Sequence, residues 1–178
     1  TEIERALAWR ENAHLIDESP PEIRRRISIV PDLESAVRDA DHVQEHVSED
    51  VRVKRAIYVE LDRLAPSSAV LASSTSGLPA SAWSESLPNR PRCLVAHPVN
   101  PPHLVPLVEI SGAPWTRPDA IERTRQLMVA VGQKPIIVRK EIDGFILNRL
   151  QGALLREAFD LYREGYASIP DIDTAVRD

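Results

Sequence analysis

The stretch Cys-Leu-Val-Ala-His-Pro-Val-Asn-Pro-Pro-His-Leu-Val-Pro-Leu-Val-Glu-Ile, residues 93–110, decides the fold. Two short apolar runs, Leu94–Ala96 and Leu107–Ile110, flank a proline-rich segment, and apolar runs bounded by turn residues are typical of buried strands. His97 then stands at the end of one strand and Glu109 inside the next. If the two strands are neighbours, an imidazole and a carboxylate meet at a strand edge, as a general base requires. An isolated pair of this kind is more often structural.

Length, charge and cysteine content narrow the classes of protein. A chain of 178 residues suffices for one domain and part of a second. The net charge of −5 leaves no basic surface for nucleic acid. One cysteine, Cys93, excludes an internal disulfide framework and fits a reducing compartment. No apolar run approaches a membrane span, so we expect a cytoplasmic protein with neither nucleic acid nor membrane as a partner.

Strands and helices are expected to alternate along most of the chain. Helices are predicted at 1–18, 32–40, 50–65, 80–87 and 117–131, and strands at 27–30, 42–47, 69–73, 94–96, 107–110 and 135–139. This alternation predicts right-handed crossovers and a largely parallel, doubly wound α/β sheet. Two consecutive helices follow, at 144–165 and from about Pro170. We therefore expect one domain at 1–141 and the start of a helical domain at 142–178.

Polar residues gather in four places at or near expected strand ends or inside the apolar helix: 45–54, 73–77, 97–100 and 148–149. In a doubly wound sheet, ligands bind outside the carboxyl ends of the strands. Each cluster also has an ordinary explanation: a solvated charged loop, a hydroxyl-capped turn, a structural histidine, and an asparagine bonded to a neighbouring helix. The chain has no zinc-ligand spacing, no Gly-x-Ser-x-Gly and no Gly-x-Gly-x-x-Gly. No metal is expected.

Five motifs together resemble the 3-hydroxyacyl-CoA dehydrogenase superfamily, and within it the lambda-crystallin, or L-gulonate 3-dehydrogenase, branch. The motifs are Val-Gln-Glu-His-Val-Ser-Glu at 43–49, Ser-Ser-Thr-Ser-Gly-Leu at 73–78, His-Pro-Val-Asn-Pro-Pro at 97–102, Leu-Val-Glu at 107–109 and Gly-Phe-Ile-Leu-Asn-Arg-Leu at 144–150. Their order and spacing are specific where any one of them alone is not. Many acyl-CoA members have Asn at position 74, whereas Ser74 looks like the hydroxy-acid branches.

The resemblance implies roles for individual residues and a Rossmann-like fold that binds NAD. His97 matches the catalytic histidine, Glu109 the carboxylate that orients it, Ser76 the serine at the reacting oxygen and Asn148 the asparagine of the substrate site. The positions that match the cofactor side are Glu49, Lys54, Ser74 and Asn100. The family's first strand, glycine-rich turn and ribose-binding acid would precede Thr1, so we expect an interior fragment of a homodimeric protein, inactive by itself.

The activity implied is oxidation of a small 3-hydroxy acid such as L-gulonate with NAD. A 3-hydroxyacyl-CoA dehydrogenase, for example of 3-hydroxybutyryl-CoA, or an L-carnitine dehydrogenase would use the same pair of residues. A protein of a different class, a non-catalytic NADH-binding structural protein, would keep the same scaffold. The same resemblance implies that two groups of residues lie outside this sequence: those that determine the choice between NAD and NADP, and those that line most of the substrate pocket.

Overall fold

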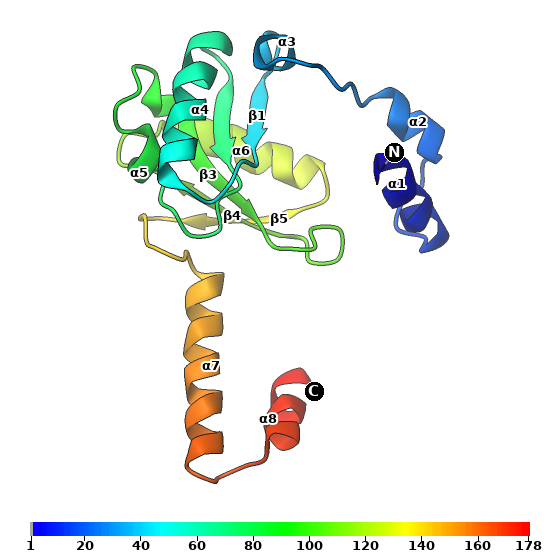
Figure 1. Ribbon diagram of the computed structural model, residues 1–178, viewed down its shortest axis with the longest axis vertical. Helices are drawn as coiled ribbons and strands as arrows, with labels where there is room; N and C mark the ends of the chain where they lie inside the picture. The colour runs from blue at the N-terminus through cyan, green and yellow to red at the C-terminus, as the bar shows by residue number, and fades with distance from the viewer. Residues whose placement is uncertain (1) are drawn as a thin grey trace.

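A five-stranded sheet forms the centre of the computed structural model, which describes residues 2–178 (Figure 1). Its strands lie side by side in sequence order: β1 His42–Glu45, β2 Val70–Ser73, β3 Cys93–Pro98, β4 Leu107–Gly112 and β5 Lys134–Val138. β3 and β4 run antiparallel, whereas the other neighbouring pairs are parallel. The expected α/β, Rossmann-like class is confirmed.

The sheet buries an apolar core on each face, because successive strand residues point to opposite sides. One core contains Leu71, Cys93 and Val95 together with buried residues of α4 (Val51–Leu64) and α5 (Ser81–Ser84). The opposite core contains Val70, Ala72, Leu94, Ala96, Val108 and Ile110 with Ala120 of α6 (Pro118–Ala130). Helices therefore cover both faces, and a short 3-10 helix, η1 Arg90–Arg92, leads into β3.

Helix α4 begins at a well-formed cap. The Asp50 side chain accepts hydrogen bonds from the backbone N–H groups of Arg52 and Val53, which satisfies donors that have no partner inside the helix. The guanidinium of Arg52 and these N–H groups hold the pKa of Asp50 down at about 2. This cap places the first turn of α4, and with it Lys54, just beyond the short loop 46–50 that follows β1.

The N-terminal region differs from the sequence-based expectation. Residues 27–30 form no strand: they are an exposed connection, with Ile29 72 % exposed, and no strand within residues 2–178 lies beside them. The expected helix at 1–18 ends earlier, as α1 Glu2–Asn12, and Thr1 lies outside the described residues. A second helix, α2 Pro20–Arg25, follows, and Ser19 and Glu22 cap it. α3, Leu33–Val37, completes this region.

Two helices follow the sheet. α7, Leu147–Arg163, runs away from it, and α8, Ile169–Arg177, lies beyond the turn that follows (Figure 1). The Ser168 hydroxyl caps α8 by accepting from the backbone N–H of Asp171. Leu150, Leu154, Leu155 and Phe159 of α7 are exposed. Within residues 2–178, no helix combines the length and the apolar character that crossing a bilayer requires.

Candidate active site

His97 and Glu109 face each other across neighbouring strands. They are partners in the antiparallel register of β3 and β4, and Nδ1 of His97 lies 3.1 Å from Oε2 of Glu109. Both side chains are buried, and Glu109 is 0 % exposed. Because a carboxylate only accepts hydrogen bonds, Nδ1 carries the proton and donates it, which leaves Nε2 of the neutral ring as an acceptor. This pair, the dyad, has the arrangement of a base with its orienting partner.

The second oxygen of Glu109 is bound by the start of α7. Oε1 accepts hydrogen bonds from the backbone N of Ile146, at 2.9 Å, and of Leu147, at 3.0 Å. N–H groups in the first turn of a helix have no acceptor within the helix, and the helix dipole favours a negative charge there. Glu109 therefore accepts from three donors and ties the sheet to the helical part of the chain.

Ser76 and Asn148 meet although 72 residues separate them in the sequence. The Asn148 side-chain amide donates a hydrogen bond to the backbone carbonyl oxygen of Ser76 at 2.7 Å. The backbone N of Gly144 donates to the carbonyl oxygen of Gly77 at 3.3 Å. The first turn of α7 is thus joined both to β4, through Glu109, and to the hydroxyl-rich loop after β2. Ser76 and Asn148 are exposed.

Glu49 holds the loop that carries Ser76. Its Oε1 atom accepts hydrogen bonds from the Thr75 hydroxyl and from the backbone N of Ser76 and Gly77, the latter two at 3.1 Å. Burial by itself would raise the pKa of Glu49, but these hydrogen bonds and the charge of Lys54 outweigh that effect and lower it below its ordinary value. The ionised carboxylate therefore fixes the backbone at Ser76.

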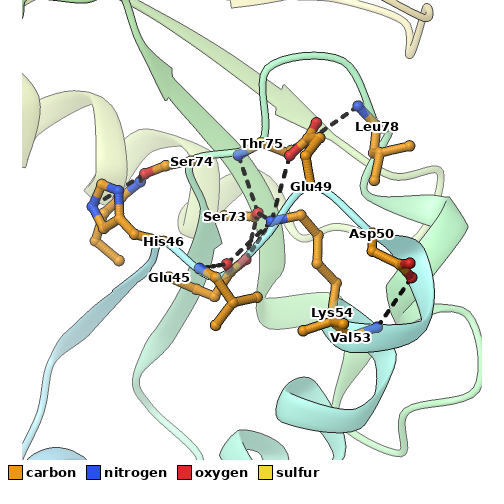
Figure 2. A network of polar contacts seen from close by, with 12 residues as sticks. Glu45, His46, Glu49, Asp50, Val53, Lys54, Ser73, Ser74, Thr75 and Leu78 are labelled. Atoms are coloured by element: carbon orange, nitrogen blue, oxygen red, sulfur yellow. Dashed lines mark hydrogen bonds and ion pairs between the residues drawn. The ribbon is translucent and has the colours of Figure 1, made fainter.

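Lys54 lies beneath this loop in a buried polar network (Figure 2). Its ammonium lies 3.1 Å from both carboxylate oxygens of Glu45 and 3.3 Å from the hydroxyl of Ser73, and 3.7 Å from Glu49. The Lys54 side chain is only 1 % exposed. The charge of Lys54, a residue matched to the cofactor side by resemblance, therefore faces Glu45 and Glu49 rather than solvent.

Within residues 2–178, no hydrogen bond joins the side chain of Ser74 or Asn100 to Glu49. The Ser74 hydroxyl accepts a 2.6 Å hydrogen bond from the Gln44 side-chain amide, which also donates to the carbonyl oxygen of Ala96 at 2.9 Å. His46 lies 3.3 Å from the same hydroxyl. Asn100 is exposed in the loop after β3, and the peptide bond that follows it is cis. Ser74 is thus tied to β1 and β3.

Sequence reasoning gave no individual role to two residues that shape this region, Gln44 and Glu45, although both lie in the motif at 43–49. Both stand at the end of β1, and Glu45 accepts from Lys54, from Ser73 and from the backbone N of Val47. A charged residue at the last position of a short strand, facing a lysine nine residues on, was the available signal. It was not decisive, because most charged residues beside a loop are solvated.

The edge formed by the carboxyl ends of β1, β2 and β3 fits the nicotinamide end of a dinucleotide. Glu49, Ser74 and Asn100 follow these ends and are at least partly exposed, at the place where doubly wound sheets bind their ligands. Their carboxylate, hydroxyl and amide groups can bind a carboxamide and a ribose. The glycine-rich turn that binds a pyrophosphate does not occur in the sequence.

A doubly wound sheet with a His–Glu dyad at its carboxyl edge, followed by consecutive helices, defines the class of NAD-binding dehydrogenases. Residues 1–142 match the family model of the "3-hydroxyacyl-CoA dehydrogenase, NAD binding domain", and residues 144–178 match the model of the family's C-terminal domain. The chain belongs to the 3-hydroxyacyl-CoA dehydrogenase superfamily, in its lambda-crystallin branch. The expected family and its cofactor, NAD, are confirmed.

Individual relatives show the same affiliation. The lambda-crystallin homolog of Homo sapiens is 44 % identical over 150 residues, which cover 84 % of this chain and 47 % of that protein. L-carnitine dehydrogenase of a Pseudomonas species is 44 % identical over 154 residues, covering 86 % and 48 %. A solved diketoreductase structure has a TM-score of 0.90 at 31 % identity, covering 99 % of this chain and 63 % of that one. The chain spans about half the length of the curated relatives it matches.

Proposed function

We propose that the protein is an oxidoreductase that transfers hydride from a small 3-hydroxy acid, similar to L-gulonate, to NAD, with His97 as the general base. The observation that carries the proposal is the buried His97–Glu109 dyad at the carboxyl edge of a dinucleotide-binding sheet. Residues 1–141 would bind the cofactor, and residues 142–178 would begin a helical domain that completes the substrate site.

Oxidation of a secondary alcohol requires removal of the hydroxyl proton, and this is the task of the dyad. NAD, when bound, supplies the hydride acceptor. Nε2 of neutral His97 accepts the proton, while Glu109 keeps the other proton on Nδ1 and stabilises the imidazolium that forms. A positioned base of this kind contributes about a hundred- to ten-thousandfold in rate.

Ser76 and Asn148 orient the substrate beside the dyad. Glu49 and the Asn148–Ser76 hydrogen bond hold these two residues together at the start of α7, where the backbone also binds Glu109 of the dyad. Polar groups held in place before the reaction begins accelerate it, because no reorganisation is needed in the transition state. Glu49, Ser74 and Asn100 would bind the nicotinamide side of the cofactor, with Lys54 acting beneath Glu49.

Three alternative functions are each supported by a specific observation. L-carnitine dehydrogenases are as similar to this chain as the lambda-crystallin homologs, and 3-hydroxybutyryl-CoA dehydrogenase shares its fold, so the dyad could oxidise carnitine or an acyl-CoA. The lambda-crystallin relatives support a non-catalytic NADH-binding structural protein. Ser74, in place of the asparagine of many acyl-CoA enzymes, favours a hydroxy acid.

NADH formation by the full-length gene product separates these activities. The substrates are L-gulonate, L-carnitine and 3-hydroxybutyryl-CoA, each offered with NAD. We expect turnover with the free hydroxy acid, loss of that turnover in His97→Ala, and unchanged NADH binding. His103→Ala, in the loop between β3 and β4 and outside the dyad, is the matched control. If the turnover of His97→Ala stays within about tenfold of the wild type, less than a base contributes, the assignment of His97 as the base is refuted. If the wild-type protein binds NADH but turns over no substrate, the structural protein is favoured.

A further inference from the structure

The turn between β5 and α7 holds two consecutive residues in the left-handed region of backbone space. Gly144 has a φ of 73° and Phe145 a φ of 49°. Glycine adopts this conformation without penalty, whereas a residue with a Cβ atom is strained there and stays only where its surroundings enforce it. Phe145 is fully buried, so its contacts, and not its own backbone preference, hold it in place.

The contacts of this turn lead to both members of the dyad. The ring centroid of Phe145 lies 5.5 Å from that of His97, with the two planes tilted by 41°. The next two residues, Ile146 and Leu147, donate their backbone N–H groups to Glu109. Three successive residues therefore contact the imidazole and the carboxylate from one side.

The ring of Phe145 restricts a movement of His97 that the hydrogen bond to Glu109 does not prevent. The single hydrogen bond at Nδ1 fixes one atom of the imidazole, and the ring can still tilt about that atom. The Phe145 ring, tilted by 41° relative to the imidazole, opposes this movement, and it offers no group that competes for the Nδ1 proton. Phe145 also belongs to the core that contains Val138 and Ala113, so a role as a plain apolar anchor is the alternative.

We propose that Phe145 is a positioning residue, whose ring holds the His97 imidazole so that Nδ1 donates to Glu109 and Nε2 is directed to the substrate hydroxyl. The inference rests on the proposed function, because it assigns Phe145 a role only if His97 is the base. The left-handed turn at Gly144 and Phe145 then places the ring against His97 and, at the same time, the two N–H groups within hydrogen-bond distance of Glu109.

The test compares Phe145→Leu with Phe159→Leu in the full-length gene product. Leucine keeps an apolar anchor but removes the flat ring, and Phe159, 68 % exposed on α7, is the matched control. We express kcat per NADH-binding site, so that unfolded molecules do not count. We expect Phe145→Leu to lower kcat about ten- to a hundredfold, because misplaced reacting groups slow a reaction by such factors. KM for the hydroxy acid should stay within about twofold, because the substrate's other contacts remain. Phe159→Leu should leave both unchanged.

A second variant decides the matter if Phe145→Leu does not fold. Gly144→Ala keeps the ring, and the added Cβ would come no closer than 3.7 Å to Asn148, but its φ of 73° strains the turn. We expect kcat to fall while NADH binding is retained. Unchanged kcat in the folded variants overturns the inference. If His97→Ala itself retains turnover, the proposed function fails; if only the Phe145 and Gly144 variants are normal, the inference alone fails.

Discussion

Glu109→Gln tests the dyad most directly, because the substitution keeps the shape of the side chain and changes only its charge and donor pattern. Glu109 accepts from His97 through one oxygen and from Ile146 and Leu147 through the other. A glutamine has one acceptor oxygen and one donor NH2 group. The oxygen must stay with the two backbone N–H groups, since an NH2 group there would face two donors. The NH2 group therefore points at Nδ1 of His97.

This orientation reverses the tautomer of the histidine. Facing a donor, Nδ1 must accept, so the proton moves to Nε2, and the ring can no longer take a proton from the substrate at that atom. A wrong tautomer of this kind lowers kcat by about 10⁴-fold, or about 5 kcal/mol of barrier. The fold loses less, because the hydrogen bonds to Ile146 and Leu147 remain and only their charge assistance goes. We expect the free energy of unfolding to fall by about 1–3 kcal/mol.

The assay is steady-state NADH formation by the full-length gene product, with NADH affinity and urea unfolding measured on the same samples. Glu122→Gln is the matched control, because Glu122 is exposed on α6 and pairs only with side chains of its own helix. The control should keep kcat. A kcat for Glu109→Gln within about tenfold of the wild type would show that the carboxylate does not set the tautomer, and the reasoning from geometry would fail.

Three further predictions concern the surroundings of the dyad. Lys54→Met leaves Glu45 buried without a counter-charge, so the free energy of unfolding, measured in urea, should fall by about 3–5 kcal/mol. Arg63→Met, at the exposed end of α4, should lower it by at most about 1 kcal/mol. Equal losses in the two variants would contradict the burial argument. Because the pKa of Glu49 is lowered in the folded protein, its ionised form stabilises the fold above its ordinary pKa of about 4.3 and loses that effect as the pH falls through the lowered value. The stability difference between the wild type and Glu49→Gln should therefore shrink in acid, and a difference independent of pH would refute this. Burial raises the pKa of Cys93 to about 12, so iodoacetamide should label the thiol only after unfolding, as mass spectrometry would detect; rapid labelling of the native protein would show that Cys93 is accessible.

The strands of the sheet were largely predictable because their signal is local. Apolar runs between turn residues predicted β2, β3, β4 and β5 to within a few residues, and they also placed His97 and Glu109 on successive strands. The strand expected at 27–30 was wrong because pairing between strands is not a local property. Its residues are suitable for a strand, but a strand exists only beside a partner, and pairing depends on parts of the chain that are distant in sequence.

The roles of Gln44, Glu45 and Phe145 were not predictable from the residue types. Each acts through a partner remote in sequence: Gln44 through Ser74, Glu45 through Lys54 and Ser73, and Phe145 through His97. Phe145 looked like one more apolar residue of the long helix expected at 144–165. Its left-handed backbone and its contact with the imidazole arise only when the turn after β5 is packed against the sheet.

The sequence by itself determined the class of fold, the family and the pair of residues on which the proposed chemistry depends. These follow from local apolar patterns and from motifs whose spacing is written in the chain. Only the tertiary structure decided that β3 and β4 pair in the register that sets His97 opposite Glu109, and that the start of α7 binds the second oxygen of Glu109. Hydrogen bonds are specific to within tenths of an ångström, and no local pattern specifies the long-range packing that sets such distances.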